Sequence, residues 1–147
     1  MNAGKSLLAG VAGATFLNVL HESVRRIVPT APRVDLLGRE VVRRVFHKQG
    51  KKAPKGNKEY AITLAADVLS NAIFYSLVGW GKGRSAWIRG LVLGLSAGLG
   101  AVKAPDYMKL SKKAVKRHQS TKLMTVAWYL LGGIVAGAVA QIISKRD

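Results

Sequence analysis

The stretch TLAADVLSNAIFYSLVGW, residues 63–80, decides the fold class of this chain. The apolar run that contains it, from Tyr60 to Gly79, has the length of about 20 residues with which a helix crosses a bilayer. Asp67 nevertheless stands near its start, and Asn71 follows one turn later. An ionised carboxylate deep in a membrane costs about 3 kcal/mol, so it should face protein or water. The stretch therefore predicts a membrane span with a polar site inside it.

Three other apolar runs extend this prediction to the whole chain. With the second span at residues 60–79, the others are expected at about residues 3–24, 86–102 and 123–143. The first run has a signal peptide as its alternative, because its apolar stretch is short and contains a cleavage-like Ala-Gly-Ala sequence. We predict an all-α fold in a single domain, residues 1–147, with four transmembrane helices.

The charge pattern predicts the orientation of these spans. The 24 Lys and Arg residues outnumber the seven Asp and Glu residues, which gives a net charge of +17. Eleven of the 24 lie in residues 21–59 and seven in residues 103–122. Because Lys and Arg are retained on the cytoplasmic side, residues 25–59 and 103–122 are predicted to be cytoplasmic loops, and both termini to lie outside the cytoplasm. Trp80 and Trp87 flank the predicted outer turn, where indole rings favour the interface.

A resemblance adds a location. The glycine-rich spans and the turn HESVRR…PTAPRVDLLG, residues 21–38, resemble small four-helix proteins of the bacterial inner membrane. The resemblance extends over about the first third of the chain and implies the bacterial inner (cytoplasmic) membrane as the location. It implies no activity and no functional residues.

Nucleic-acid binding and enzymatic chemistry are not indicated. The basic stretches HKQGKKAPKGNK and KLSKKAVKRHQSTK lack the interleaved aromatic residues on which bases stack. His21 and Glu22 begin like a zinc-protease motif, but no histidine follows four residues later, and the chain has no cysteine. No phosphate loop or nucleophile elbow occurs. We predict a non-enzymatic protein with no catalytic residue, metal, cofactor or nucleic-acid partner.

The first basic loop is predicted to contain an interfacial amphipathic helix, LLGREVVRRVFHK, residues 36–48. Two prolines in residues 29–32 end the first span, and Asp35 is predicted to cap the new helix. Three arginines of this helix are predicted to bind anionic lipid head groups or an acidic partner: Arg39, Arg43 and Arg44. Packing of this helix on the protein's own cytoplasmic end is the alternative.

Glycines recur at helical spacing in the third and fourth spans. Gly90, Gly94 and Gly98 follow one another at four-residue intervals, and Gly133 and Gly137 do the same. A helix face without side chains allows close approach of a second helix, which drives association in lipid. These five glycines are predicted to lie at helix contacts, within the chain or between chains of a homo-oligomer.

The polar cluster predicted around Asp67 draws on several helices. Thr63 and Asn71 share its helix face. Further members are expected from other cytoplasmic helix ends: His21, Arg25 or Lys103 as the partner, with Asn18 and Glu22 nearby. A buried structural ion pair and a proton or ion relay are both open.

Two functions are compatible with this pattern. The first is a structural or accessory subunit that packs helices through glycine faces, binds anionic lipid, and forms a homo-oligomer or part of a larger membrane complex. The alternative is a small oligomeric channel or transporter with a polar path near Asp67. Four helices enclose little space, so a pore would require several copies.

Overall fold

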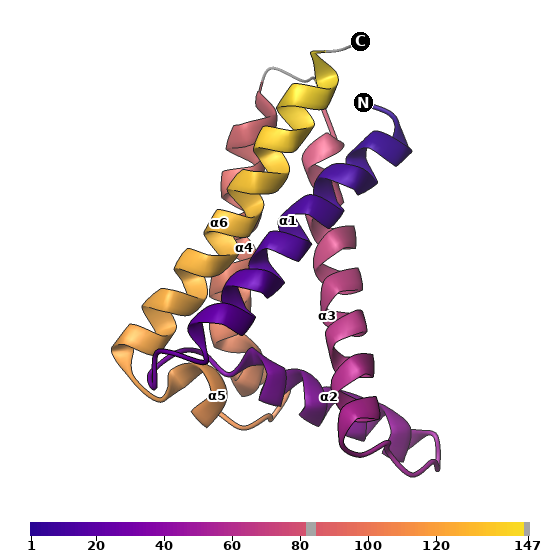
Figure 1. The fold of residues 1–147 in the computed structure, drawn as a ribbon, viewed down its shortest axis with the longest axis vertical. Coiled ribbons are helices and arrows are strands. Elements are labelled where there is room, and N and C mark those ends of the chain that lie inside the picture. The colour runs from indigo at the N-terminus through magenta and orange to yellow at the C-terminus, as the bar shows by residue number, and fades with distance from the viewer. Residues whose placement is uncertain (82–84, 146–147) are drawn as a thin grey trace.

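The computed structural model describes residues 1–81 and 85–145, and within these ranges the secondary structure is helical, with no strand. Figure 1 shows the arrangement of α1 (Ala3–Val24), α2 (Val34–Lys48), α3 (Asn57–Ser76) with the 3-10 turn η1 (Leu77–Gly79), α4 (Ala86–Tyr107), α5 (Lys113–Lys116) and α6 (Gln119–Ser144). The all-α prediction is confirmed for these residues. Lys82 and Arg84 of the predicted outer turn lie outside them.

Four helices are long and apolar enough to cross a membrane: Ala3–Val24, Asn57–Gly79, Ala86–Tyr107 and Gln119–Ser144. All four predicted spans are therefore helices, although α4 continues five residues past the predicted end and α6 begins four residues earlier. The difference has a simple cause. Lys103 and Lys122 bound the apolar runs, but lysine is a good helix former and does not end a helix.

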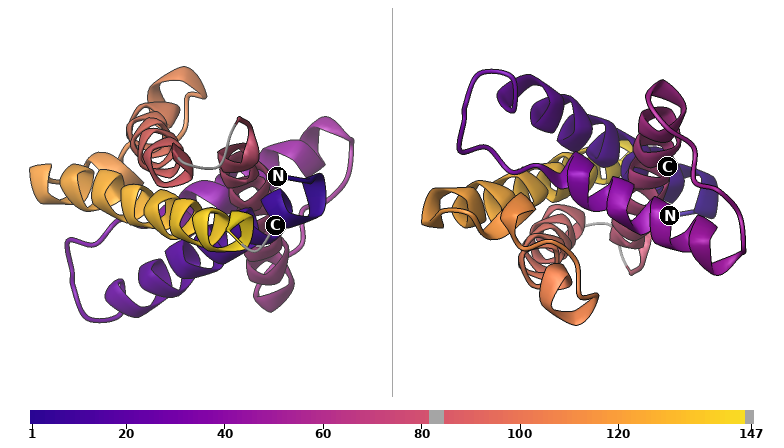
Figure 2. Two further views of the ribbon diagram at one scale, coloured as in Figure 1. Left: turned by 90° about the horizontal axis from the view of Figure 1, so that it is seen from above. Right: turned by 90° about the horizontal axis from the view of Figure 1, so that it is seen from below.

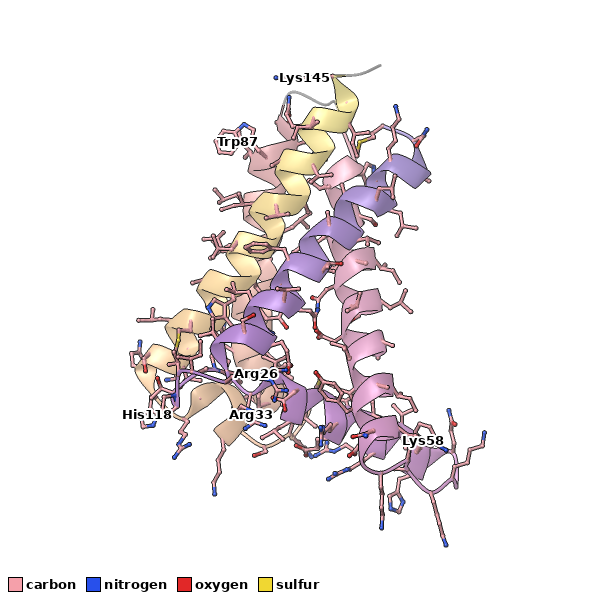
Figure 3. All side chains as sticks on the ribbon, viewed as in Figure 1. Arg26, Arg33, Lys58, Trp87, His118 and Lys145 are labelled. Carbon is pink, nitrogen blue, oxygen red and sulfur yellow. The ribbon has the colours of Figure 1, made fainter. Side chains whose placement is uncertain are left out.

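The long helices run alternately up and down, which gathers the charged segments at one end. The two termini lie together at one end, and α2 and α5 lie at the other (Figure 1). We call this second end the basic end, because residues 25–59 and 103–122 lie there. Figure 3 shows Arg26, Arg33, Lys58 and His118 at the basic end, with Trp87 and Lys145 at the opposite end.

The antiparallel pair α4 and α6 forms the most extensive helix contact, and glycines line it. A Cβ atom at Gly94 would lie 2.7 Å from the carbonyl oxygen of Tyr129, and one at Gly98 would lie 2.7 Å from Cα of Val126. Carbon atoms normally approach no closer than about 3.5 Å. The backbones thus lie too close for any side chain at these two positions.

The α6 side of this contact is equally tight. A Cβ atom at Gly137 would lie 2.7 Å from Cα of Trp87, and Gly90 and Gly133 face each other's backbone. All five glycines singled out from the sequence therefore lie between α4 and α6 of one chain. This leaves them no exposed face with which to contact a second copy, since all five are buried.

Helix α1 packs against both α3 and α6 through small residues that the sequence analysis did not assign to a contact. A Cβ atom at Gly10 would lie 2.7 Å from the backbone nitrogen of Ser76, and one at Gly13 would lie 2.8 Å from Cβ of Ala136. The buried Tyr75 hydroxyl donates a 2.8 Å hydrogen bond to the carbonyl oxygen of Tyr129. These contacts place a closed core in the half of the bundle away from the basic end.

Helix α2 lies across the basic end, as the view from below shows (Figure 2). Its buried side chains, Leu37 and Val42, face the protein, where Leu37 packs in a cluster with Leu110, Ala114 and Val115. The predicted cap is wrong: the helix begins at Val34, and Asp35 lies in its first turn. The Asp35 carboxylate is bound by arginines instead of the helix amides.

Candidate functional site

A small polar cavity of about 40 Å³ lies between α1, α2 and α3, on the basic side of the closed core. Figure 1 shows the reason for its position, since α1 and α3 diverge toward the basic end and α2 lies across the gap. Its polar lining comes from eight side chains: Asn18, His21, Glu22, Arg25, Asp35, Tyr60, Thr63 and Asp67.

Small residues set how the three helices meet here. Near the start of α1 the absence of a side chain at Gly10 lets the backbones of α1 and α3 touch. Farther along, polar side chains fill the widening space. Gly38 then brings α2 against α3, because a Cβ atom at this position would lie 2.6 Å from Cγ2 of Thr63. Close packing at these two glycines thus sets how α1, α2 and α3 meet around the cavity.

Arg25 forms the charged side of the cavity. Its guanidinium donates two hydrogen bonds to Glu22, of 2.8 and 2.7 Å, and one of 3.2 Å to Asp35. Arg33 adds two bonds of 2.9 Å to Asp35, and the Tyr60 hydroxyl donates to Glu22 at 3.0 Å. Both carboxylates therefore have direct cationic partners.

These partners fix the ionisation of Asp35. Burial alone would raise its pKa, but the hydrogen bonds from Arg33 and the charges of Arg33, Arg25 and Arg39 outweigh burial and hold this pKa below its ordinary value. The same contacts raise the pKa of Arg25, first through its hydrogen bonds with Glu22. The α1–α2 junction is thus held by a fully charged network.

Asp67 stands apart from this network. Its Oδ1 accepts a 3.1 Å hydrogen bond from Nδ2 of Asn71, which also donates to the Asp67 carbonyl oxygen at 2.9 Å. Within residues 1–81 and 85–145 no ion pair reaches Asp67. Arg25 is engaged by Glu22 and Asp35, and Lys103 is exposed on α4, away from the cavity lining. His21 also makes no ion pair with Asp67, so none of the three predicted partners pairs with this carboxylate in the described part of the chain.

Two buried polar atoms of the cavity wall have no hydrogen-bond partner: Nε2 of His21 and Oγ1 of Thr63. The imidazole ring of His21 packs against two aromatic rings of α6. Its centroid lies 4.8 Å from that of Trp128 and 5.8 Å from that of Tyr129. Unsatisfied buried polar groups are rare. A cavity of this size has room for more than one water molecule, so the site can hold water or another small polar species.

The three arginines predicted to bind lipid have partners within the chain. Glu59, which is only 2% exposed, lies 2.5 Å from Nε of Arg43 and 3.9 Å from Nη1 of Arg39. Arg44 donates hydrogen bonds to the carbonyl oxygens of Met108 and Lys109, at the end of α4. These contacts join α2 to α3 and α4. This is the arrangement expected from the alternative to lipid binding, in which the amphipathic helix packs on its own protein.

Glu59 is the residue that sequence reasoning missed. The sequence analysis treated it as the end of a loop and gave it no role. A signal was present, because Glu59, Thr63, Asp67 and Asn71 recur every four residues and so share one face of α3. Arg39 and Arg43 have the same spacing on α2, which offers a matching basic stripe.

The side chains at this site offer hydrogen-bonding groups and charge. In the described part of the chain, no three His, Cys, Asp or Glu side chains converge as a metal-binding group. Comparison with protein-family models, with curated proteins and with solved structures finds no match. The resemblance to small four-helix proteins of the bacterial inner membrane therefore stays a prediction.

Proposed function

We propose that this chain is a non-enzymatic integral membrane protein, a structural or accessory subunit whose basic end faces the cytoplasm and holds anionic lipid. Four helices of spanning length support this, as do the large apolar side chains exposed around the bundle, among them Leu8, Val19, Leu69, Val92 and Leu123. Exposed apolar surface of this extent needs a lipid or protein neighbour.

The observation that carries the structural role is the closed interior. Leu17 and Tyr75 have no exposed surface, Tyr129 is 7% exposed, and the glycine contact of α4 with α6 has no space between the backbones. Within residues 1–81 and 85–145, these packed side chains leave a single copy without a continuous polar path from the cavity to the opposite end. The bundle instead presents an outer surface for lipid or partner helices.

The orientation follows from the basic end. Eighteen of the 24 Lys and Arg residues lie in the two segments that the fold brings together there. Such residues are retained on the cytoplasmic side, where they also meet the negatively charged leaflet. The proposal therefore places both termini outside the cytoplasm, in agreement with the bacterial inner membrane as the location.

The second candidate is an oligomeric channel or transporter, and the polar cavity is the observation that favours it. Asp67 has no ion pair among the described residues, and His21 and Thr63 each keep an unpartnered buried atom. Ionisable groups inside a membrane often mark a proton or ion path. In this function, several copies would join their cavities.

Purification of the full chain in mild detergent and its reconstitution into liposomes separates the two functions. The structural role predicts that proton and Na⁺ flux stays at the level of empty liposomes, and that a mass measurement of the purified protein finds bound anionic lipid. Flux above that level, together with a discrete homo-oligomeric mass, would establish the channel instead.

A further inference from the structure

A second pocket, of about 620 Å³, lies at the basic end between the α1–α2 connection, α5 and the start of α6. Its lining combines apolar residues with basic ones: Pro29, Ala31, Leu36, Arg33, Lys113 and Arg117. We call it the basic pocket. Its volume is within the range of ordinary ligand sites, which is about 300–1,000 Å³.

Two cations that line the basic pocket have no partner among the described residues. Arg39 and Arg43 are paired with Glu59, while Lys112 and Lys116 are paired with Asp106. The side chains of Lys113 and Arg117, by contrast, make no ion pair or hydrogen bond with the described residues. Two unpaired cations therefore line an apolar pocket at this end of the bundle.

The frame of the basic pocket is built from ordered contacts. The backbone nitrogen of Arg33 donates a 2.9 Å hydrogen bond to the carbonyl oxygen of Ala114. The Thr121 hydroxyl, in a residue only 1% exposed, donates at 2.8 Å to the carbonyl oxygen of Thr30. The Arg33 guanidinium is held by Asp35. The loop, α5 and α6 are thus fixed to one another around the pocket.

We propose that the basic pocket binds the phosphate head group of an anionic membrane lipid, with Lys113 and Arg117 as the charge partners. Basic pockets between helices at the cytoplasmic side are the usual sites for such head groups. This inference rests on the proposed membrane location, because it requires the end of α1 and the start of α6 to lie at the head-group level. It shifts the lipid site away from Arg39, Arg43 and Arg44.

The apolar part of the pocket favours a lipid over a soluble phosphate. Leu36 is 45% exposed and lines the pocket together with Pro29 and the buried Ala31. A soluble phosphate would leave this surface in water, whereas the glycerol and first acyl carbons of a lipid would cover it. The charge complementarity and the apolar wall therefore point to the same ligand.

The test titrates the full chain in detergent with dioleoyl phosphatidylglycerol and counts bound lipid by native mass spectrometry. A variant with Lys113→Gln and Arg117→Gln should bind about 30-fold more weakly, because each cation contributes about 1 kcal/mol and 1.4 kcal/mol corresponds to a factor of ten. The matched control, Lys51→Gln with Lys52→Gln, removes the same charge from exposed residues and should change affinity by less than about threefold.

Further variants and a competitor keep each outcome decisive. Should the double variant fail to fold, Arg117→Gln alone is compared with Arg117→Lys, which keeps the charge and should retain most of the affinity. Equal weakening in pocket and control variants, or none in either, would overturn the proposal. Displacement of the lipid by equimolar glycerol 3-phosphate would assign the pocket to a soluble phosphate. An outward-facing basic end would overturn the proposed function instead.

Discussion

Replacing Gly94 by alanine should separate α4 from α6. The new Cβ atom would lie 2.7 Å from the carbonyl oxygen of Tyr129 and 2.8 Å from Cα of Leu130. Because about 3.5 Å is the normal limit, the two helices must move apart by close to 1 Å, and the other contacts along them weaken as well. Overpacking of this kind costs about 1–3 kcal/mol. We expect Gly94→Ala to lower the free energy of unfolding by this amount.

Gly100 supplies a matched control on the same helix. No atom lies within 4 Å of a Cβ atom placed there, and the residue is exposed. Gly100→Ala should therefore be neutral or stabilise the chain by up to about 1 kcal/mol, since alanine is the better helix former. Unfolding in mixed detergent and SDS micelles, followed by far-UV circular dichroism, measures both variants. Equal stability of the two would refute the close contact of α4 with α6.

Three further predictions concern the basic end. Asp67→Asn should keep or raise the unfolding temperature in detergent at neutral pH, because it removes a carboxylate that no cation among the described residues balances; a marked loss of stability would reveal a hidden cationic partner. Glu59→Gln should lower the unfolding temperature and speed proteolytic cleavage within residues 49–56, since Arg43 and Arg39 lose their shared acid and α2 is held less firmly on α3. An unchanged cleavage rate would argue against the attachment of α2 to α3. Because folding lowers the pKa of Asp35, its ionised carboxylate stabilises the folded chain above the unfolded pKa of about 4, and this stabilisation is lost as pH falls through the folded pKa. Asp35→Asn should therefore reduce the loss of unfolding free energy at acid pH. The same pH dependence of stability in the variant and the parent would contradict the role of Arg33 and Arg25.

The four long helices could be predicted because an apolar segment needs about 20 residues to cross the hydrocarbon core of a bilayer as a helix. Each of the four runs became a helix, and the spacing of Gly90, Gly94 and Gly98 predicted a contact face. The partner of that face was not predictable, because a stripe of small residues is compatible with contact inside one chain or between chains. Only the antiparallel arrangement of α4 and α6 assigns it to one chain.

The polar site was predicted only in part, because charge pairing depends on how far helices diverge. His21, Glu22, Thr63 and Asp67 do surround one cavity, as expected from their positions near the helix ends that were predicted to be cytoplasmic. Which acid pairs with which arginine follows from tertiary geometry. Arg25 reaches Glu22 and Asp35 because α2 turns back across the basic end, so that Asp67 has no ion pair in the described part of the chain.

Cysteine labelling tests the central claim most directly, because the chain has no cysteine of its own. Single cysteines are placed at Lys55 and Ser120, both exposed at the basic end, and at Trp80, which is 80% exposed at the opposite end. Intact cells are then treated with a maleimide that does not cross membranes. The account predicts labelling at position 80 before lysis and at positions 55 and 120 only after lysis. Labelling of position 55 or 120 in intact cells would contradict a cytoplasmic basic end.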